Sequence, residues 1–332
     1  MKKIILIPLL LIISFSSFVL YNFFTSSSNY LKTYRYLPSA SYKVPVGLIE
    51  ELNKPEAEEA KSHLIRITLK VINYNTWEDF INYIDVKVYK EKILPIDTEQ
   101  LVVILNLSKD ISVAVVFVLM GDEYLYHSHI ENLVPVEKVE FLSIPSQTHK
   151  MLLVYQVLDE EFGGFFYEEF VDIYYYIVDD FKRVWQKTLY YEEIYNEGWL
   201  SPEGSKNTWN KVIEETAINF VTNDKIKVNS ITSLHKYTAN SSTFPTEDDF
   251  ILTENKTFKQ SYYWSHEFNY FILGEVSQSV FKHKTAVIED SQDNLKFFYN
   301  INNQNYRLIN TNGEVFYLPK KSLKGMFETL YQ

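Results

Sequence analysis

The stretch Met151–Leu189 constrains the fold most, because three apolar runs follow one another there with turn signals between them. The first run, Met151–Leu158, is apolar at nearly every position, which is typical of a strand covered on both faces. The second, Phe170–Val178, alternates, with one apolar face and a second face that carries Asp172 and aromatic rings. The third, Phe181–Leu189, follows a pair of aspartates. The stretch therefore predicts three consecutive strands.

Strand-like runs recur along most of the chain at a spacing of roughly 8–15 residues, and the βαβ alternation of a parallel sheet is missing. We therefore predict a mainly β fold, an antiparallel meander or sandwich with a few short helices. A degenerate β-propeller is the alternative, because four consecutive runs have the shape of one blade. These runs lie near 137–144, 151–158, 170–178 and 181–189.

A few segments carry more specific local signals. Composition or helical spacing predicts helices at 55–62, 76–84 and 209–220, with a strand as the alternative for 217–221. The run Leu64–Ile72 alternates strictly between apolar and polar residues and predicts a half-covered strand. Asn312-Gly313 is the strongest hairpin signal, within a C-terminal region whose strand rhythm resembles a small SH3-like barrel.

The first residues have the pattern of an export segment. Lys2 and Lys3 precede an apolar run from Ile4 to Phe24, which as a helix would match the ~30 Å hydrocarbon core of a bilayer. We expect an uncleaved signal anchor with the body outside the cytoplasm, because no clear A-x-A site follows; a cleaved signal peptide and secretion are the alternative. The predicted division is 1–24 anchor or signal peptide, 25–45 polar stalk, 46–274 mainly-β extracytoplasmic domain, and 275–332 small β module with a terminal helix from about Lys321.

Composition excludes several classes of function. The net charge of -11 disfavours nucleic acid as the main partner, because phosphate contacts need clustered Lys and Arg. The chain has no Cys, which excludes disulfides, thiolate metal sites and thiol nucleophiles. The glycine-rich nucleotide-binding loops and the G-x-S-x-G nucleophile turn are absent as well. We therefore predict no cofactor.

His127 and His129 form the sharpest candidate for a metal site. Residues i and i+2 of a regular strand point the same way, so both imidazoles could reach one cation, with Asp122 or Glu123 adding an oxygen ligand. Two histidines at this spacing also occur by chance, as half-exposed residues beside a turn.

Acidic residues around the turn before Phe165 raise the possibility of a glycoside hydrolase. Such an enzyme needs two carboxylates about 5–10 Å apart in a cleft lined with rings. The candidates are Asp159, Glu160, Glu161, Glu168, Glu169 and Asp172. Acidic residues at hairpin turns are usually only solvated, and sequence cannot show which of these face each other.

Clustered aromatic residues could instead form a binding surface, because exposed rings recognise sugars or peptides and apolar patches mark interaction sites. The candidate binding residues are Tyr174, Tyr176, Trp185, Tyr262, Tyr263 and Trp264. The competing interpretation is that these rings fill the core.

From these features we expect a membrane-tethered, extracytoplasmic protein of the bacterial envelope that is more a binding or scaffolding protein than an enzyme. Its expected partners are the membrane, through the N-terminal helix, and an envelope polysaccharide or protein. A wall-polysaccharide hydrolase with paired carboxylates in an aromatic cleft is the alternative.

Overall fold

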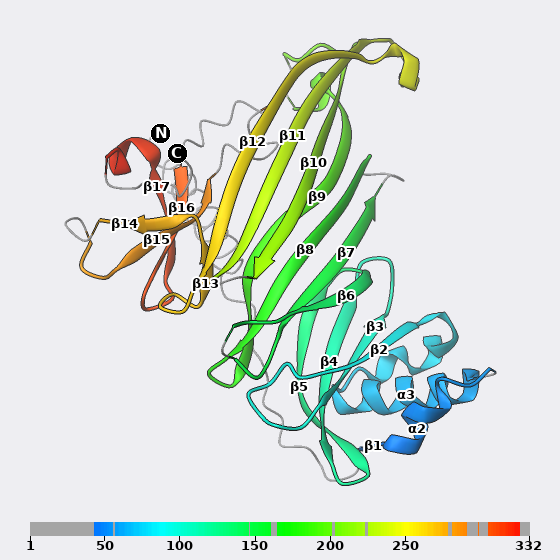
Figure 1. Cartoon of the computed structure of the whole chain (residues 1–332). Coiled ribbons are helices and arrows are strands. Elements are labelled where there is room, and N and C mark those ends of the chain that lie inside the picture. Colours follow the sequence, from blue (N-terminus) through cyan, green and yellow to red (C-terminus); the bar gives the residue numbers. More distant parts are fainter. Residues whose placement is uncertain are drawn as a thin grey trace, which may run out of the picture. The chain divides into compact units, whose positions relative to one another are not determined.

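The computed structural model describes residues 43–325 except 56, 146, 161–164, 201–202, 223–224, 278–280, 291–297 and 299–304. This part of the chain is mainly antiparallel β, which confirms that part of the predicted fold class (Figure 1). The predicted N-terminal anchor and nearly all of the predicted stalk lie outside the described residues. Among the residues that are described, no helix is long and apolar enough to cross a membrane.

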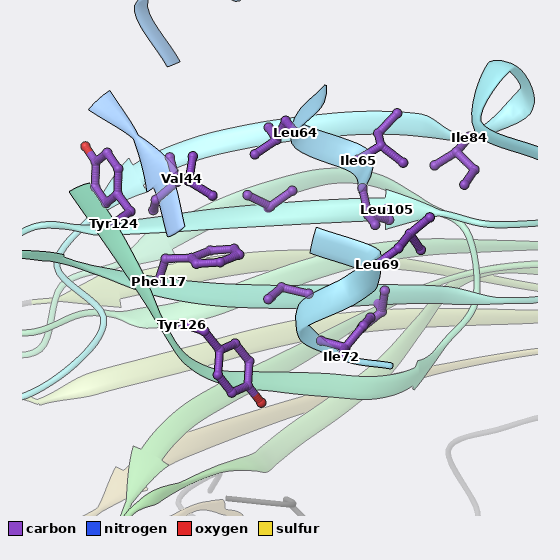
Figure 2. Packing of buried hydrophobic residues seen from close by; sticks show 14 of the residues in the cluster. Val44, Leu64, Ile65, Leu69, Ile72, Ile84, Leu105, Phe117, Tyr124 and Tyr126 are labelled. Atoms are coloured by element: carbon purple, nitrogen blue, oxygen red, sulfur yellow. The ribbon is translucent and has the colours of Figure 1, made fainter. Parts of the chain in front are cut away.

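A five-stranded sheet in the order β1-β5-β4-β3-β2 begins the described chain. Its strands are β1 (Lys43–Pro45), β2 (Asp85–Glu91), β3 (Gln100–Asn106), β4 (Ser112–Met120) and β5 (Glu123–Leu133). The last three residues of the predicted stalk thus form an edge strand paired with β5. Helical segments cover one face: α2 (Val46–Glu51), α3 (Glu58–Val71) and the 3-10 segment η1 (Asn75–Tyr83). Figure 2 shows Leu64 and Leu69 of α3 packed with Leu105 and Phe117 of the sheet.

The helix α3 overturns one local prediction. Leu64–Ile72 was expected to be a strand, yet α3 continues through Val71. Its buried residues are Ala60, Leu64, Ile65, Thr68 and Leu69, which is the spacing of one helical face. The apolar residues of this segment fit both periods, and the start Glu58-Glu59-Ala60 consists of strong helix formers, from which the helix propagates through them.

The second sheet has eight strands in the order β13-β12-β11-β10-β9-β8-β7-β6, so each strand pairs with its neighbours in sequence. The strands are β6 (Val136–Leu142), β7 (Met151–Glu160), β8 (Phe166–Ile177), β9 (Asp180–Asn196), β10 (Thr208–Thr222), β11 (Ile226–Asn240), β12 (Ile251–Ser265) and β13 (Tyr270–Ile272). The three strands predicted for Met151–Leu189 are confirmed as β7, β8 and β9. The four runs that resembled a propeller blade are neighbours in this larger meander, whose long strands bend along their length (Figure 1).

Both faces of this sheet are covered in its first half. In β7, Met151 and Leu153 belong to one buried cluster and Leu152 and Val154 to another, as the uniformly apolar pattern predicted. The prediction for β8 was incomplete, because the face that carries Asp172 is covered too. Residues of the five-stranded sheet pack against it in the same cluster as Tyr174 and Tyr176.

The strand β10 is a second correction. Residues 209–220 were expected to form a helix, but β10 runs from Thr208 to Thr222 and pairs with β11 over its whole length. The apolar spacing in this segment fits a helix by coincidence, whereas its content of Val, Ile, Thr and Phe favours a strand. Pairing with β9 and β11 satisfies its backbone groups without a helix.

A third sheet, in the order β14-β15-β16-β17, ends the described chain. It consists of β14 (Gly274–Val276), β15 (Thr285–Asp290), β16 (Asn305–Asn310) and β17 (Val315–Pro319), followed by the 3-10 segment η4 (Lys320–Leu323). Asn312-Gly313 makes the predicted hairpin turn between β16 and β17, with Gly313 at a φ of 80°. Val276, Val287 and Leu308 share a buried cluster with the eight-stranded sheet. The SH3-like barrel and the terminal helix stay predictions.

Candidate functional site

Two neighbouring strands of the eight-stranded sheet separate partway along their length. β9 and β10 form a ladder from Tyr190–Asn196 to Trp209–Glu215. Beyond it, β9 stays paired with β8 as far as Asp180, and β10 stays paired with β11 as far as Thr222. The β8–β9 ladder has bulges at Glu169/Phe170 and at Ile173/Tyr174, and bulges increase the local twist of a strand.

A cavity of about 300 Å³ opens at this divergence, and we call it the β9 cavity. Its walls come from two sheets: β8, the first half of β9, the end of the β9–β10 ladder, β12 and β13 of the eight-stranded sheet, and β15 and β16 of the third sheet. The lining residues are Glu168, Phe170, Arg183, Trp185, Gln186, Lys187, Thr188, Glu214, Tyr262, Tyr270, Ile288, Glu289 and Arg307. Charged groups of both signs and aromatic rings therefore meet in one space.

The three basic residues of the β9 cavity each face a carboxylate. Lys187 Nζ lies 3.5 Å from Glu214 Oε1, and Arg307 Nη1 lies 3.4 Å from Glu289 Oε2. Arg183 Nη1 lies 3.6 Å from Oδ2 of Asp172, a nearly fully buried carboxylate behind the cavity wall. These separations exceed the 2.7–2.9 Å of a close charge-assisted hydrogen bond. The pairs therefore neutralise one another without being tightly locked.

Glu168 is the remaining carboxylate of the β9 cavity. Its Oε1 accepts a hydrogen bond of 2.9 Å from the hydroxyl of Thr188. Within the described part of the chain, no basic side chain lies within ion-pair distance of it. Burial raises the pKa of Glu168, the Thr188 hydrogen bond opposes this shift, and the negative charge of Asp172 adds to it.

The carboxylates named from the sequence are placed very differently from one another. Glu168 lies in the β9 cavity, and Asp172 is buried beside it with a pKa that burial raises. Asp159 is exposed, Glu160 pairs with Lys109, and Glu169 accepts a hydrogen bond from Tyr167. Glu161 lies outside the described residues. The other two carboxylates of the cavity, Glu214 and Glu289, were not among these candidates.

A second feature is a cluster of aromatic rings at one end of the eight-stranded sheet, which we call the ring cluster. It consists of Phe165, Trp199, Trp209 and Phe244. Phe165 stacks on Trp199 and Phe244 with centroids 5.7 and 5.4 Å apart. Trp209 meets Trp199 and Phe244 edge to face, at 5.2 Å each. Trp209 is only 9% exposed, but Phe165, Trp199 and Phe244 are 36%, 57% and 49% exposed.

The meander explains why these four rings meet. Phe165 precedes β8, and Trp199 lies in the short helix α5 (Glu197–Leu200) that follows β9. Trp209 begins β10, and Phe244 follows the end of β11. In an antiparallel meander these four points lie at the same end of the sheet. Rings separated by up to 79 positions in sequence are therefore brought together by the strand pairing.

Two structural details hold the ring cluster in place. Phe165 has a φ of 56°, an unfavourable backbone conformation for a bulky residue, yet its carbonyl accepts a hydrogen bond from Ile194 of β9. Lys211 Nζ bridges Glu192 at 2.9 Å and Glu247 at 2.7 Å, and so ties the loop after Phe244 to the sheet. The cost of such a strained residue is typically about 1–3 kcal/mol, which suggests that the position of the ring matters.

A hollow of about 230 Å³ lies beside the ring cluster. It is lined by Phe165, Phe166, Tyr167, Glu192, Ile194, Phe244 and Glu247. Apolar rings therefore adjoin carboxylate oxygens that can accept hydrogen bonds. Together they offer stacking surfaces and polar groups in the combination that carbohydrate recognition uses.

Most of the rings predicted to bind ligands are in the core. Tyr174, Tyr176, Trp185, Tyr262 and Trp264 are buried, whereas Tyr263 is half-buried with Lys225 Nζ 5.7 Å from its ring centre. Only Trp185 and Tyr262 of this set line the β9 cavity. Trp199 and Phe244 were not among the candidates, because they follow the ends of different strands and no local motif joins them.

The two predicted metal-binding histidines do not share a face. Val116 and Phe117 of β4 pair with Ser128 and Tyr126, so His127 is the extra residue of a β-bulge. His129 Nδ1 lies 2.6 Å from the hydroxyl of Tyr126, on the helix-covered face. The described residues hold no group of three or more His, Asp or Glu side chains suited to a metal ion.

His127 contacts the other side of the sheet. Its ring centre lies 5.5 Å from that of Tyr176, which belongs to the cluster between the two larger sheets. The assumption that residues i and i+2 point the same way therefore fails at this site, because the bulge inserts one residue between the two alternating series. The proposed shared metal site loses its geometric basis.

No family model, curated protein or solved structure matches this chain. The function is therefore inferred from the ring cluster and the β9 cavity themselves.

Proposed function

We propose that this protein is a membrane-tethered, extracytoplasmic binding protein of the bacterial envelope, without enzymatic activity, and that its ring cluster binds an envelope glycan. The observation that carries the proposal is the exposure of three stacked rings, Phe165, Trp199 and Phe244, over the buried Trp209. Burying such rings only on contact with a ligand yields about 25 cal/mol per Å² of apolar surface removed from water.

The charges around the ring cluster favour a neutral glycan over an anionic polymer. Glu192 and Glu247 line the adjacent hollow, and Glu197 begins α5 next to Trp199. Lys211 pairs with the first two, which leaves this surface acidic. An anionic polymer would be repelled, whereas sugar hydroxyls donate hydrogen bonds to carboxylates while their C–H faces stack on rings.

The N-terminal segment supports the cellular part of the proposal. Its lysines followed by a long apolar run are the pattern of a signal anchor, which would hold the body outside the cytoplasm next to envelope polymers. The body then provides a binding surface and does not act as a catalyst.

Cosedimentation with isolated neutral envelope polysaccharide tests this function. We expect the wild-type protein to sediment with the polymer, and a Trp199→Ala, Phe244→Ala double variant to stay in solution. Tyr83→Ala is the matched control, because Tyr83 is an 84% exposed ring elsewhere on the surface. Equal sedimentation of all three proteins would rule out the ring cluster as the binding surface.

A wall-polysaccharide hydrolase is the second candidate, and the β9 cavity is the observation that favours it. Glu168 and Glu214 line this cavity together with Trp185 and Tyr262. Burial raises the pKa of Glu168, as a general acid requires, and Glu214, which pairs with Lys187, would be the second carboxylate. Release of reducing ends from wall glycan, abolished by Glu168→Gln or Glu214→Gln, would establish this activity.

Binding remains the better-supported function because the β9 cavity is crowded with basic groups. Arg183, Lys187 and Arg307 line it along with the carboxylates. A glycosidase needs room for a sugar ring and a water between its two carboxylates, whereas these charges mostly neutralise one another.

A further inference from the structure

We propose that the β9 cavity binds a small organic cation, and that the ligand's ammonium group pairs with the carboxylate of Glu168. This goes beyond glycan binding by the ring cluster. The β9 cavity and the hollow beside the ring cluster have no lining residue in common.

The charge balance of the cavity leads to this ligand. Each basic group has a carboxylate opposite it: Lys187 with Glu214, Arg307 with Glu289, and Arg183 with Asp172. When these pairs are set aside, Glu168 is the carboxylate left over. Its hydrogen bond from Thr188 is neutral and supplies no positive charge.

Burial makes this imbalance consequential. A carboxylate in a partly desolvated site is costly to ionise unless a cation compensates it, and among the described residues no cation lies within ion-pair distance of Glu168. A bound ammonium would supply the compensating positive charge and favour the ionised form of Glu168.

The rest of the lining suits an organic cation better than a metal ion. Phe170, Trp185, Tyr262 and Tyr270 contribute aromatic walls, and ring faces attract alkylammonium groups. The described residues offer no set of three carboxylates or imidazoles that could replace the hydration shell of a metal.

The size of the β9 cavity limits the ligand to a small molecule. Its volume of about 300 Å³ is larger than the ~150 Å³ of a cavity that accepts benzene. Putrescine and choline fit this range and differ in whether the nitrogen can donate hydrogen bonds. Putrescine, with two primary ammonium groups, and choline, with one quaternary ammonium, are therefore suitable probes for two kinds of cationic head group.

Isothermal titration calorimetry of the full-length protein tests the proposal with putrescine, choline and the neutral 1,4-butanediol. We expect at least one of the two amines to bind and the diol to give no heat above dilution. Glu168→Gln should weaken amine binding by about tenfold or more, because a charge-assisted contact is lost. Glu160→Gln, which removes a carboxylate outside the cavity, is the matched control and should bind as the wild type does.

The pH dependence of amine binding is a second test of the proposal, and it needs no variant. Because burial raises the pKa of Glu168, amine affinity should begin to fall at a higher pH than for an ordinary glutamate as the solution is acidified. Binding of the diol as tight as that of the amines, unchanged affinity in Glu168→Gln, or no amine binding at neutral pH would overturn the proposal. Hydrolysis of a glycan that depends on Glu168 would also overturn it.

Discussion

The side chains of His127 and His129, two positions apart in β5, lie on opposite faces of the five-stranded sheet. His127 lies against Tyr176, in the cluster between the sheets, and His129 hydrogen-bonds with Tyr126 beneath the helices. The bulge at His127 separates them. One consequence is that His129 belongs to a partly buried polar network.

This network runs through four side chains. Glu131 lies 3.0 Å from His129 Nε2 and accepts a hydrogen bond of 3.1 Å from the hydroxyl of Tyr74. A neutral imidazole with its proton on Nε2 satisfies all of these contacts, because Nδ1 can then accept from Tyr126. Replacement of any member leaves a partner unsatisfied.

We therefore expect His129→Ala to lower the free energy of unfolding by about 1–3 kcal/mol, the usual cost of leaving buried hydrogen-bond partners unmet. Urea denaturation measures this change. His63→Ala, on the exposed face of α3, is the control and should change stability by less than about 0.5 kcal/mol. A double-mutant cycle with Tyr126→Phe should show coupling, and strict additivity would contradict the network.

The same network predicts a dependence of stability on acid pH. The hydrogen bond from His129 lowers the pKa of Glu131, opposed by burial. A carboxylate whose pKa is lower in the folded state stabilises the fold above its unfolded pKa, and this contribution is lost as the pH falls through the folded pKa. Unfolding curves from about pH 6 to about pH 3 should show the loss, with a shallower slope in Glu131→Gln. The exposed Glu99→Gln should leave the slope unchanged.

The local pattern of the sequence was sufficient for the main strands but not for residues whose neighbours decide their role. Met151–Leu158 read correctly as a doubly covered strand, because apolar residues on both faces have no other stable arrangement in water. Leu64–Ile72 and 209–220 were assigned to the wrong element, because their apolar positions fit two periods and tertiary pairing decided between them.

The candidate sites were largely hidden from the sequence. The ring cluster is assembled from four strand ends, and the β9 cavity depends on where a ladder stops, so neither leaves a local motif. The bulge at His127 likewise has no sequence signature. Only Trp185, Tyr262 and Glu168 among the predicted residues reach either site.

Because α3 is a helix and not a strand, the stability costs of two alanine substitutions should fall in a definite order, and a strand would reverse that order. Leu64 is fully buried in α3, whereas Ile67 is only partly buried. Leu64→Ala should cost about 2–5 kcal/mol of stability and Ile67→Ala clearly less. In a half-covered strand Ile67 would face the core and Leu64 the solvent, so the opposite order in urea denaturation would contradict the helix.

We expect the side chain of Asp172 to lower the free energy of unfolding at neutral pH. Burial raises its pKa, although Arg183, Gln156 and Tyr174 oppose the shift, and its Oδ1 has no hydrogen-bond partner. A carboxyl with a raised folded pKa favours folding when protonated, and this advantage is lost as the pH rises. Asp172→Asn should therefore raise the free energy of unfolding at pH 7 by roughly 1 kcal/mol, which is measured as a higher melting temperature. The gain should disappear below about pH 4, and Asp97→Asn should show none at any pH.

Lys211 should act on glycan binding as a positioning residue. Its ammonium joins Glu192 to Glu247, and although burial lowers its pKa, hydrogen bonds to both carboxylates outweigh this effect and raise it. Lys211→Met should release the loop that carries Phe244 and weaken glycan binding severalfold. Lys211→Arg should restore it, because the positive charge is kept. If both variants lose binding equally, the bridge does not position the ring.

Calorimetric titration with a soluble neutral oligosaccharide of the envelope polymer tests the central claim most directly. The wild-type protein should bind it, and Trp199→Ala should weaken binding by about 2 kcal/mol, roughly 30-fold, as removal of a central aromatic contact does. Tyr83→Ala should bind as the wild type. Oligosaccharide binding that is unchanged in Trp199→Ala, or no binding by the wild type, would contradict the assignment of the ring cluster as a glycan-binding surface.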